Sequence, residues 1–192
     1  MGQRPTCVHE GRYLIAKIEN PVNIFILDRD IGKCARYHAD QHVVKMILEG
    51  TQMLCTVLGK HGIDAPYKST HFNHPCTLWA ERSLSNWFWL RKLTLQLNKE
   101  FSFRYQKRID HKAAVVAREL PPPPIVDIGL TEFVQAMPDT YKVPGNPVEA
   151  YRRFYVGEKS QFAKWTRRRP PKWFLEAIKE KNAKEEDPQI KV

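Results

Sequence analysis

Residues 39–49, ADQHVVKMILE, decide how the rest of the chain is interpreted. They predict the middle of a long helix, spanning about residues 33–58, because polar and apolar side chains alternate at helical spacing. Four polar residues fall within about 60° of one another on a wheel of about 100° per residue: His38, His42, Lys45 and Glu49. The opposite face of the helix is apolar and carries Val43, Val44, Ile47, Leu54 and Leu58.

The polar face of this helix is built from groups that carry out acid–base chemistry. Glu49 is a candidate to activate water, orient an amine or stabilise a developing cation. Lys45 is a candidate Schiff-base nucleophile, and Gln41 flanks the same stripe. The alternative is an ordinary solvated helix face, because many surface helices place Lys and Glu four residues apart.

The totals point to one basic globular unit. The 192 residues carry a net charge of +10, which favours polyanions such as nucleic acid. No apolar run is long enough to span a bilayer. The four cysteines are widely spaced and form no CxxC pair, and the N-terminus has no continuous apolar segment. We therefore expect a cytoplasmic protein with free thiols and no membrane partner.

The pattern along the chain predicts a mainly α fold, a single compact helical domain of about five helices with one short N-terminal strand. The strand is VNIFIL, residues 22–27, which is rich in β-branched and aromatic residues. The helices are expected at 33–58, 75–105, 111–120, 146–165 and 172–181, with a helical turn at 131–137. Residues 1–21 are interpreted as an appendage, 22–182 as the helical domain and 183–192 as a charged tail.

The start of the second helix carries a further polar group. Trp79, Arg82 and Asn86 share one helix face with Ser83. An aromatic ring, a cation and small hydrogen-bonding groups can hold a nucleobase by stacking and edge contacts. We expect His38, His42 and Glu49 to line a cleft that also exposes part of this group. The alternative is a tryptophan of the core with a polar boundary.

The last third of the chain is basic and aromatic, a composition that suits a phosphate backbone with exposed bases. Its members are Tyr151, Arg152, Arg153, Tyr155, Lys159, Lys164, Trp165, Arg167, Arg168, Arg169, Lys172 and Trp173. The expected DNA contacts are Arg152, Arg153, Lys164 and the three arginines 167–169. The alternative is a solvated run of charges.

Two histidine pairs leave a metal site open as an interpretation. His38 and His42 have the HxxxH spacing of two ligands on one helix, and His71 and His74 lie before Cys76. The sequence has no HExxH, and no pair of cysteines supports such a site. We therefore assign no metal and no cofactor, and keep a metal-dependent nucleic-acid hydrolase as an alternative function.

Residues 39–49 resemble the phage endonuclease V type of pyrimidine-dimer DNA glycosylase. Members of that family carry Asp-Gln-His with a glutamate seven residues after the histidine, on an early helix that follows a short Asn-hydrophobic stretch. Here NIFILD, ADQH and Glu49 stand in that order and spacing. The terminal element Arg169, Pro170, Trp173 and Phe174 is also similar.

The resemblance implies a small all-α enzyme that binds duplex DNA, flips one nucleotide and releases a damaged or modified, possibly pyrimidine, base. Glu49 would be the catalytic carboxylate and His42 a contact to DNA or sugar. That family uses its N-terminal amine as nucleophile, directly before the first hydrophobic stretch, whereas some twenty residues precede that stretch here. Either the chain is extended upstream of that stretch, or Lys45, another amine or water takes the role of nucleophile, or the lyase chemistry is lost. A non-catalytic DNA-binding protein is the second interpretation.

Overall fold

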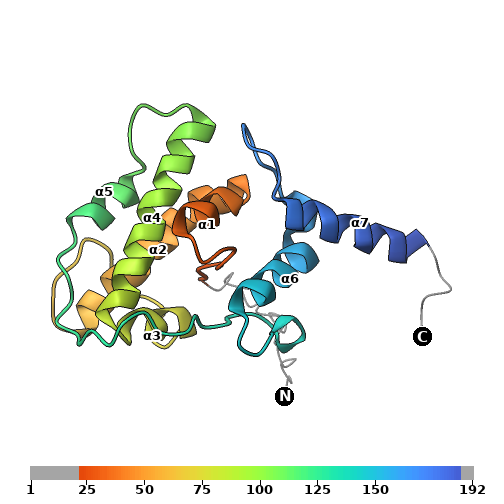
Figure 1. Ribbon diagram of the computed structural model, residues 1–192. Helices are drawn as coiled ribbons and strands as arrows, with labels where there is room; N and C mark the ends of the chain where they lie inside the picture. Colours follow the sequence, from red (N-terminus) through yellow and green to blue (C-terminus); the bar gives the residue numbers. More distant parts are fainter. Residues whose placement is uncertain (1–21, 187–192) are drawn as a thin grey trace, which may run out of the picture.

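The computed structural model describes residues 22–186 and shows a single, mainly helical domain (Figure 1). Its α-helices are α1 (Ile31–Tyr37), α2 (Asp40–Lys60), α3 (Pro75–Glu81), α4 (Leu84–Tyr105), α5 (Lys112–Glu119), α6 (Pro147–Lys159) and α7 (Lys172–Glu186), with 3-10 turns at Asp139–Tyr141 and Ser160–Phe162. The predicted fold class is confirmed. The expected appendage, residues 1–21, lies outside the described residues, and α7 extends into the segment expected to be a tail.

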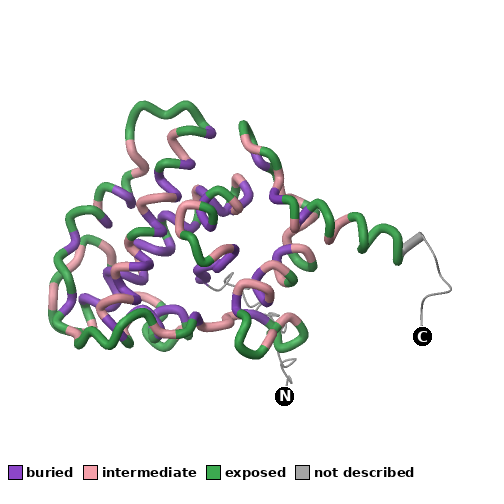
Figure 2. The backbone as a smooth tube through the Cα atoms, viewed as in Figure 1, coloured by how far each residue is buried: buried purple, intermediate pink, exposed green. Residues whose placement is uncertain are grey.

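Helix α2 is the central element of the fold. It packs against α3, α4 and α5, while α1 packs against α4 and α6 packs against α7. Figure 1 shows α1–α5 gathered on one side, with α6 and α7 on the other. Figure 2 shows that many buried residues lie along α2 and α4. Gly50 permits the close approach of α2 and α4, because a Cβ there would collide with Thr94.

The predicted long helix 33–58 is interrupted at His38 and Ala39, so that α1 and α2 are separate helices. The interruption has a tertiary cause. The N–H of Ala39 donates to the hydroxyl of Tyr155 (2.8 Å), and the N–H of Asp40 donates to the carbonyl of Lys164 (2.8 Å). Both donors are thus satisfied by the C-terminal third of the chain instead of by the preceding helical turn.

The predicted helix 75–105 is likewise divided, here at Ser83, whose backbone is extended. Asp127 explains the division, since its carboxylate accepts from the Ser83 hydroxyl (2.9 Å) and from the N–H of Ser85 (3.1 Å). A carboxylate at the N-terminus of α4 satisfies orphan donors there and complements the helix dipole.

The predicted strand 22–27 is wrong: residues 22–186 contain no β-strand. The segment is buried and irregular, and side chains satisfy its backbone donors. Ile24 N–H donates to the side chain of Asn23 (2.8 Å), and Leu27 N–H donates to Sγ of Cys34 (3.4 Å). The apolar run therefore supplies core residues without a partner strand.

The later elements follow their sequence signals more closely. Residues 112–119 form α5, close to the predicted range. Asn146 caps α6 by accepting from the N–H of Glu149 (3.2 Å), although α6 ends at Lys159 and not near residue 165. Residues 131–137 form no helical turn; the 3-10 turn begins at Asp139 instead.

Candidate active site

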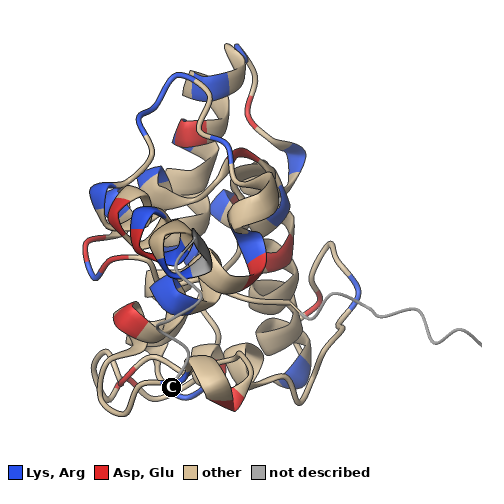
Figure 3. Ribbon diagram, turned by 90° about the vertical axis from the view of Figure 1, so that its right-hand side faces the viewer, with Lys and Arg blue, Asp and Glu red and all other residues tan. Residues whose placement is uncertain are grey.

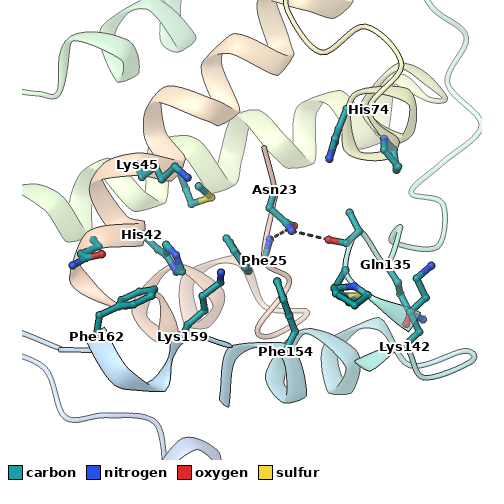
Figure 4. Close-up of a pocket in the computed structure, with 16 residues that line it drawn as sticks. Asn23, Phe25, His42, Lys45, His74, Gln135, Lys142, Phe154, Lys159 and Phe162 are labelled. Carbon is teal, nitrogen blue, oxygen red and sulfur yellow. Dashed lines mark hydrogen bonds between the residues drawn. The ribbon is translucent and has the colours of Figure 1, made fainter. Parts of the chain in front are cut away.

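A cavity of about 590 Å³ opens between α2, α6 and the segment 135–142 (Figure 4). Its wall brings together distant parts of the chain: Asn23, Phe25, Gln41, His42, Lys45, Met46, His74, Pro75, Gln135, Ala136, Met137, Pro138, Lys142, Phe154, Lys159 and Phe162. Its size lies within the range of about 300–1,000 Å³ that is typical of small-molecule sites.

Aromatic rings form one side of the cavity. Phe25 stacks on the imidazole of His42, with ring centroids 4.5 Å apart, and lies nearly parallel to Phe154 at 6.1 Å. Phe162 meets His42 edge to face at 5.6 Å. Phe25 has a positive φ of 38°, a conformation that is strained for a bulky residue and that concentrates at functional sites.

Three lysines surround this aromatic wall, and Figure 4 shows each of them at the cavity. Nζ of Lys159 lies 5.0 Å from the centroid of the Phe154 ring. Lys142 pairs with the exposed Asp139 at 2.8 Å. Lys45 is half-exposed and lies 3.1 Å from Oε1 of Glu49. The cavity is therefore both aromatic and cationic, which suits an anionic ligand with a planar ring.

Glu49 lies directly behind the cavity wall and is nearly buried. Its Oε2 accepts from the backbone N–H of Asn23 (3.2 Å), and its Oε1 pairs with Lys45 (3.1 Å). Burial raises the pKa of this carboxyl, and the hydrogen bond from Lys45 opposes that rise. The result is a carboxylate held between a cavity-lining amine and a cavity-lining amide, with little access to water.

His42 is a buried imidazole with one ring nitrogen engaged. Its Nδ1 lies 2.6 Å from the hydroxyl of Tyr155. Its pKa is lowered to about 3, chiefly by burial and also by the nearby His38, Lys159 and Lys45. His42 is therefore neutral near pH 7.

His38 is not part of this site, which corrects the predicted stripe of four residues. It is fully buried at the end of α1, and its Nδ1 donates to the carbonyl of Cys34 (2.8 Å). Burial lowers its pKa to about 4. Because the helix breaks after it, His38 does not continue the face of α2. Gln41, by contrast, is exposed at the cavity.

The expected nucleobase contacts at the second helix are wrong for Trp79 and Asn86. Trp79 is buried against Trp89 and Phe133. Asn86 is fully buried, donates to the carbonyl of Trp79 (2.7 Å) and to the hydroxyl of Thr131 (2.8 Å), and accepts from the N–H of Thr131. Arg82 is exposed, but none of the three residues lines the cavity.

The basic C-terminal third divides into structural and exposed cations. Arg152 donates to the carbonyl of Leu27 and stacks over Trp173. Arg168 pairs with the buried Glu100, which also binds Arg104. These contacts correct the expectation that Arg152 and Arg168 are free to bind DNA.

The remaining predicted DNA contacts are on the surface. Arg153 is exposed and pairs with Glu149. Lys164, Arg167 and Arg169 are exposed and form no ion pair within residues 22–186. Figure 3 shows that Lys and Arg positions are interspersed with Asp and Glu positions along the ribbon in that view.

His42 and His74, one from each histidine pair, both line the cavity, but the four histidines form no metal site. Within residues 22–186, no group of three or more His, Cys, Asp or Glu side chains is placed to hold a metal ion. His74 caps α3 by accepting from the N–H of Cys76 (3.2 Å), as a capping residue would. Cys34, Cys55 and Cys76 are buried free thiols, and no helix of this part of the chain could cross a membrane.

Sequence reasoning missed several residues of the cavity. The sequence pattern places Lys159, and the buried Tyr155 behind the wall, only in the basic third, and it places Phe25 in a strand. Lys142, Phe154 and Phe162 carried no signal. The spacing of Tyr155 and Lys159, four residues apart on α6, places both on one helix face, but nothing in the sequence aligns that face with His42. No protein-family model, curated protein or solved structure matches the chain.

Proposed function

We propose that this protein is a DNA-acting enzyme of glycosylase type, which holds a flipped nucleotide in the cavity and releases its base with the help of Glu49. The observation that supports this best is the Lys45–Glu49 pair at the edge of a cavity walled by aromatic rings and lysines. The resemblance of residues 39–49 to the endonuclease V type of glycosylase agrees with this assignment.

The cavity wall suits one nucleotide taken out of the duplex. Phe25, Phe154 and Phe162 offer faces and edges on which a base can stack, and stacking contributes about 1–3 kcal/mol per base. Lys142 and Lys159 lie at the same cavity and can bind the flanking phosphates. Enzymes that act on a base must extrude it, because its reactive atoms are inaccessible inside the stack.

Glu49 is placed for the chemical step. As the bond from C1′ to the base breaks and its electron pair leaves with the base, positive charge develops on the sugar, and a fixed carboxylate nearby stabilises it. The raised pKa of Glu49 also makes it a better proton acceptor. Glu49 can therefore take a proton from the ammonium of Lys45, 3.1 Å away, or from water.

Lys45 is the proposed nucleophile. The backbone nitrogen of Asn23 also lies against Glu49, at 3.2 Å, but it is a peptide amide whose lone pair is delocalised and cannot attack carbon. The deprotonated amine of Lys45 would bond to C1′ as the base leaves with its electron pair. The C1′–O4′ bond then breaks, the proton lost from nitrogen goes to O4′, and the Schiff base formed between nitrogen and C1′ permits strand cleavage.

The test uses duplex oligonucleotides with ultraviolet lesions, deaminated bases and abasic sites. Glu49→Gln should lower base release by about 10²–10³-fold while DNA binding and helicity are retained. The exposed Glu119 on α5 provides the control, since Glu119→Gln should change neither. Full activity of Glu49→Gln on every substrate that the wild type cleaves would refute the glycosylase assignment.

Borohydride trapping tests whether Lys45 or another amine attacks C1′. The trapped enzyme–DNA adduct should disappear in Lys45→Ala and persist in Lys99→Ala, which removes an exposed lysine of α4. An adduct that survives Lys45→Ala excludes Lys45 as the attacking amine.

A non-catalytic DNA-binding protein is the second candidate, favoured by the net charge of +10 and by the exposed Lys164, Arg167 and Arg169. It predicts that the wild type binds duplex DNA and releases no base from any of the substrates.

A further inference from the structure

Tyr155 connects the break between α1 and α2 to the cavity. It is fully buried on α6. Its hydroxyl lies 2.8 Å from the backbone nitrogen of Ala39 and 2.6 Å from Nδ1 of His42. The hydroxyl forms no other hydrogen bond within the described residues, so these two atoms account for its hydrogen bonding.

The positions of the hydrogens follow from the chemistry of the two partners. The peptide N–H of Ala39 can only donate, so the Tyr155 oxygen accepts that bond. The hydroxyl hydrogen then has one acceptor within reach, Nδ1 of His42. Leaving a buried hydroxyl hydrogen unpaired costs about 1–3 kcal/mol, so Tyr155 donates to Nδ1. An imidazole whose Nδ1 accepts a hydrogen bond carries its proton on Nε2 when it is neutral.

We propose that Tyr155 is a positioning residue, which holds His42 as the neutral Nε2–H tautomer so that the cavity offers this N–H to an oxygen of the ligand. The oxygen belongs either to a carbonyl of a base or to a phosphate, because both accept such a bond. The assignment of the His42 tautomer does not depend on the proposed function. The identification of the ligand oxygen rests on the proposed function.

Three features of the site agree with this role. Phe25 stacks on the imidazole at 4.5 Å and fixes the plane of the ring. Burial keeps the imidazole uncharged near pH 7, because it lowers the pKa of His42 to about 3. The remaining nitrogen, Nε2, has no hydrogen-bond partner within residues 22–186, and His42 lines the cavity.

The tautomer has a consequence for the proposed reaction. A histidine that presents N–H cannot remove a proton from Lys45 or from water at that nitrogen. Glu49 is then the proton acceptor, and His42 orients the ligand as a neutral donor. A neutral donor binds an oxygen without adding a fourth positive charge to Lys45, Lys142 and Lys159.

The first measurement is a long-range ¹H–¹⁵N spectrum of histidine-labelled protein without DNA, at pH 7. Wild-type His42 should show a protonated Nε2 and an unprotonated Nδ1. Tyr155→Phe should convert this single tautomer into a mixture. Tyr151→Phe is the matched control, because Tyr151 is also buried on α6, one turn earlier, but its hydroxyl bonds to the backbone of Val134 and Ala136. It should leave the spectrum of His42 unchanged.

The second measurement identifies the ligand oxygen with two probes, thymidine for carbonyl and inorganic phosphate for phosphate. One of them should shift the Nε2–H proton downfield, and Tyr155→Phe should weaken its binding about tenfold. A wild-type His42 that is charged or protonated on Nδ1 overturns the proposal even if Tyr155→Phe does not fold. A single Nε2–H tautomer that persists in Tyr155→Phe also overturns the proposal. A spectrum that responds to neither probe overturns the assignment of the ligand oxygen, and base release tests the proposed function separately.

Discussion

The cavity side of α2 and the start of α4 were predicted as sites by the same argument, a group of polar residues on one helix face. The structure separates them. At the start of α4, the amide of Asn86 is used completely by Trp79 and Thr131, inside the core. On α2, His42 and Lys45 keep a ring nitrogen and an amine at the wall of a cavity.

The difference shows what distinguishes a structural polar group from a candidate functional one. A buried polar side chain has to be hydrogen-bonded, and at α4 its partners come from segment 126–131, which passes beside the helix start. At α2 the partner of His42 engages Nδ1 alone, while both oxygens of Glu49 have partners, one of which is the cavity-lining amine of Lys45. The capacity that remains unused faces a cavity, and this is the physical basis of the proposed site.

The largest expected effect is the response of the two regions to pH. His38 and His42 have pKa values of about 4 and about 3 in the folded protein, against an ordinary value of 6.5. The unfolded chain therefore binds more protons below pH 6.5, so stability falls as the pH falls. The loss should reach about 4 kcal/mol between pH 8 and pH 5, offset in part by Glu49, whose pKa is raised.

The start of α4 should respond only at much lower pH. Hydrogen bonds from Ser85, Gly129 and Ser83 lower the pKa of Asp127 to about 2, so its contribution is present above pH 3.8 and is lost as the pH falls toward 2. Urea denaturation between pH 8 and pH 5 measures the contrast. His42→Gln should reduce the slope with pH, because it removes one of the two buried neutral imidazoles. Stability that is constant over this range would contradict the burial of both histidines as neutral groups.

The next largest effect is expected from breaking the structural region itself. Asn86→Ala should lower the free energy of unfolding by about 2–4 kcal/mol, because it removes the hydrogen bonds of the buried Asn86 amide to the Trp79 carbonyl and to Thr131. Gln41→Ala, at an exposed position of the cavity rim, should stay within about 0.5 kcal/mol of the wild type. Urea denaturation of both variants is the measurement. Equal stability would place Asn86 outside the core network.

The smallest effect should appear in the arginine run 167–169. There, a structural arginine, Arg168, lies between two exposed ones. Arg167→Ala and Arg169→Ala should each make the slope of log K for DNA against log[salt] shallower by about 1, since each removes an exposed cation. Arg168→Ala should leave the slope unchanged and lower stability, because Arg168 binds Glu100. Fluorescence anisotropy measures the salt slopes. An equal change of slope in all three variants would show that Arg168 also contacts phosphate.

The sequence by itself determined the helical class, the capping of α6 by Asn146 and the placement of Lys45 and Glu49 on one face of α2. These features depend on local spacing and on short-range hydrogen bonds, which the order of residues contains. The tight packing of α2 against α4 depends on Gly50, where a Cβ would collide with Thr94, and no local pattern identifies that partner.

The tertiary structure alone decided that α1 and α2 separate after His38, that Asp127 ends one helix and begins another, and that the cavity joins α2 to α6. Each of these depends on hydrogen bonds between residues far apart in the chain. The clearest case is Tyr155, which lies 116 residues from Ala39 and 113 from His42 and bonds to both. No local pattern contains such a pairing, because it forms only when folding brings the buried face of α6 against the start of α2.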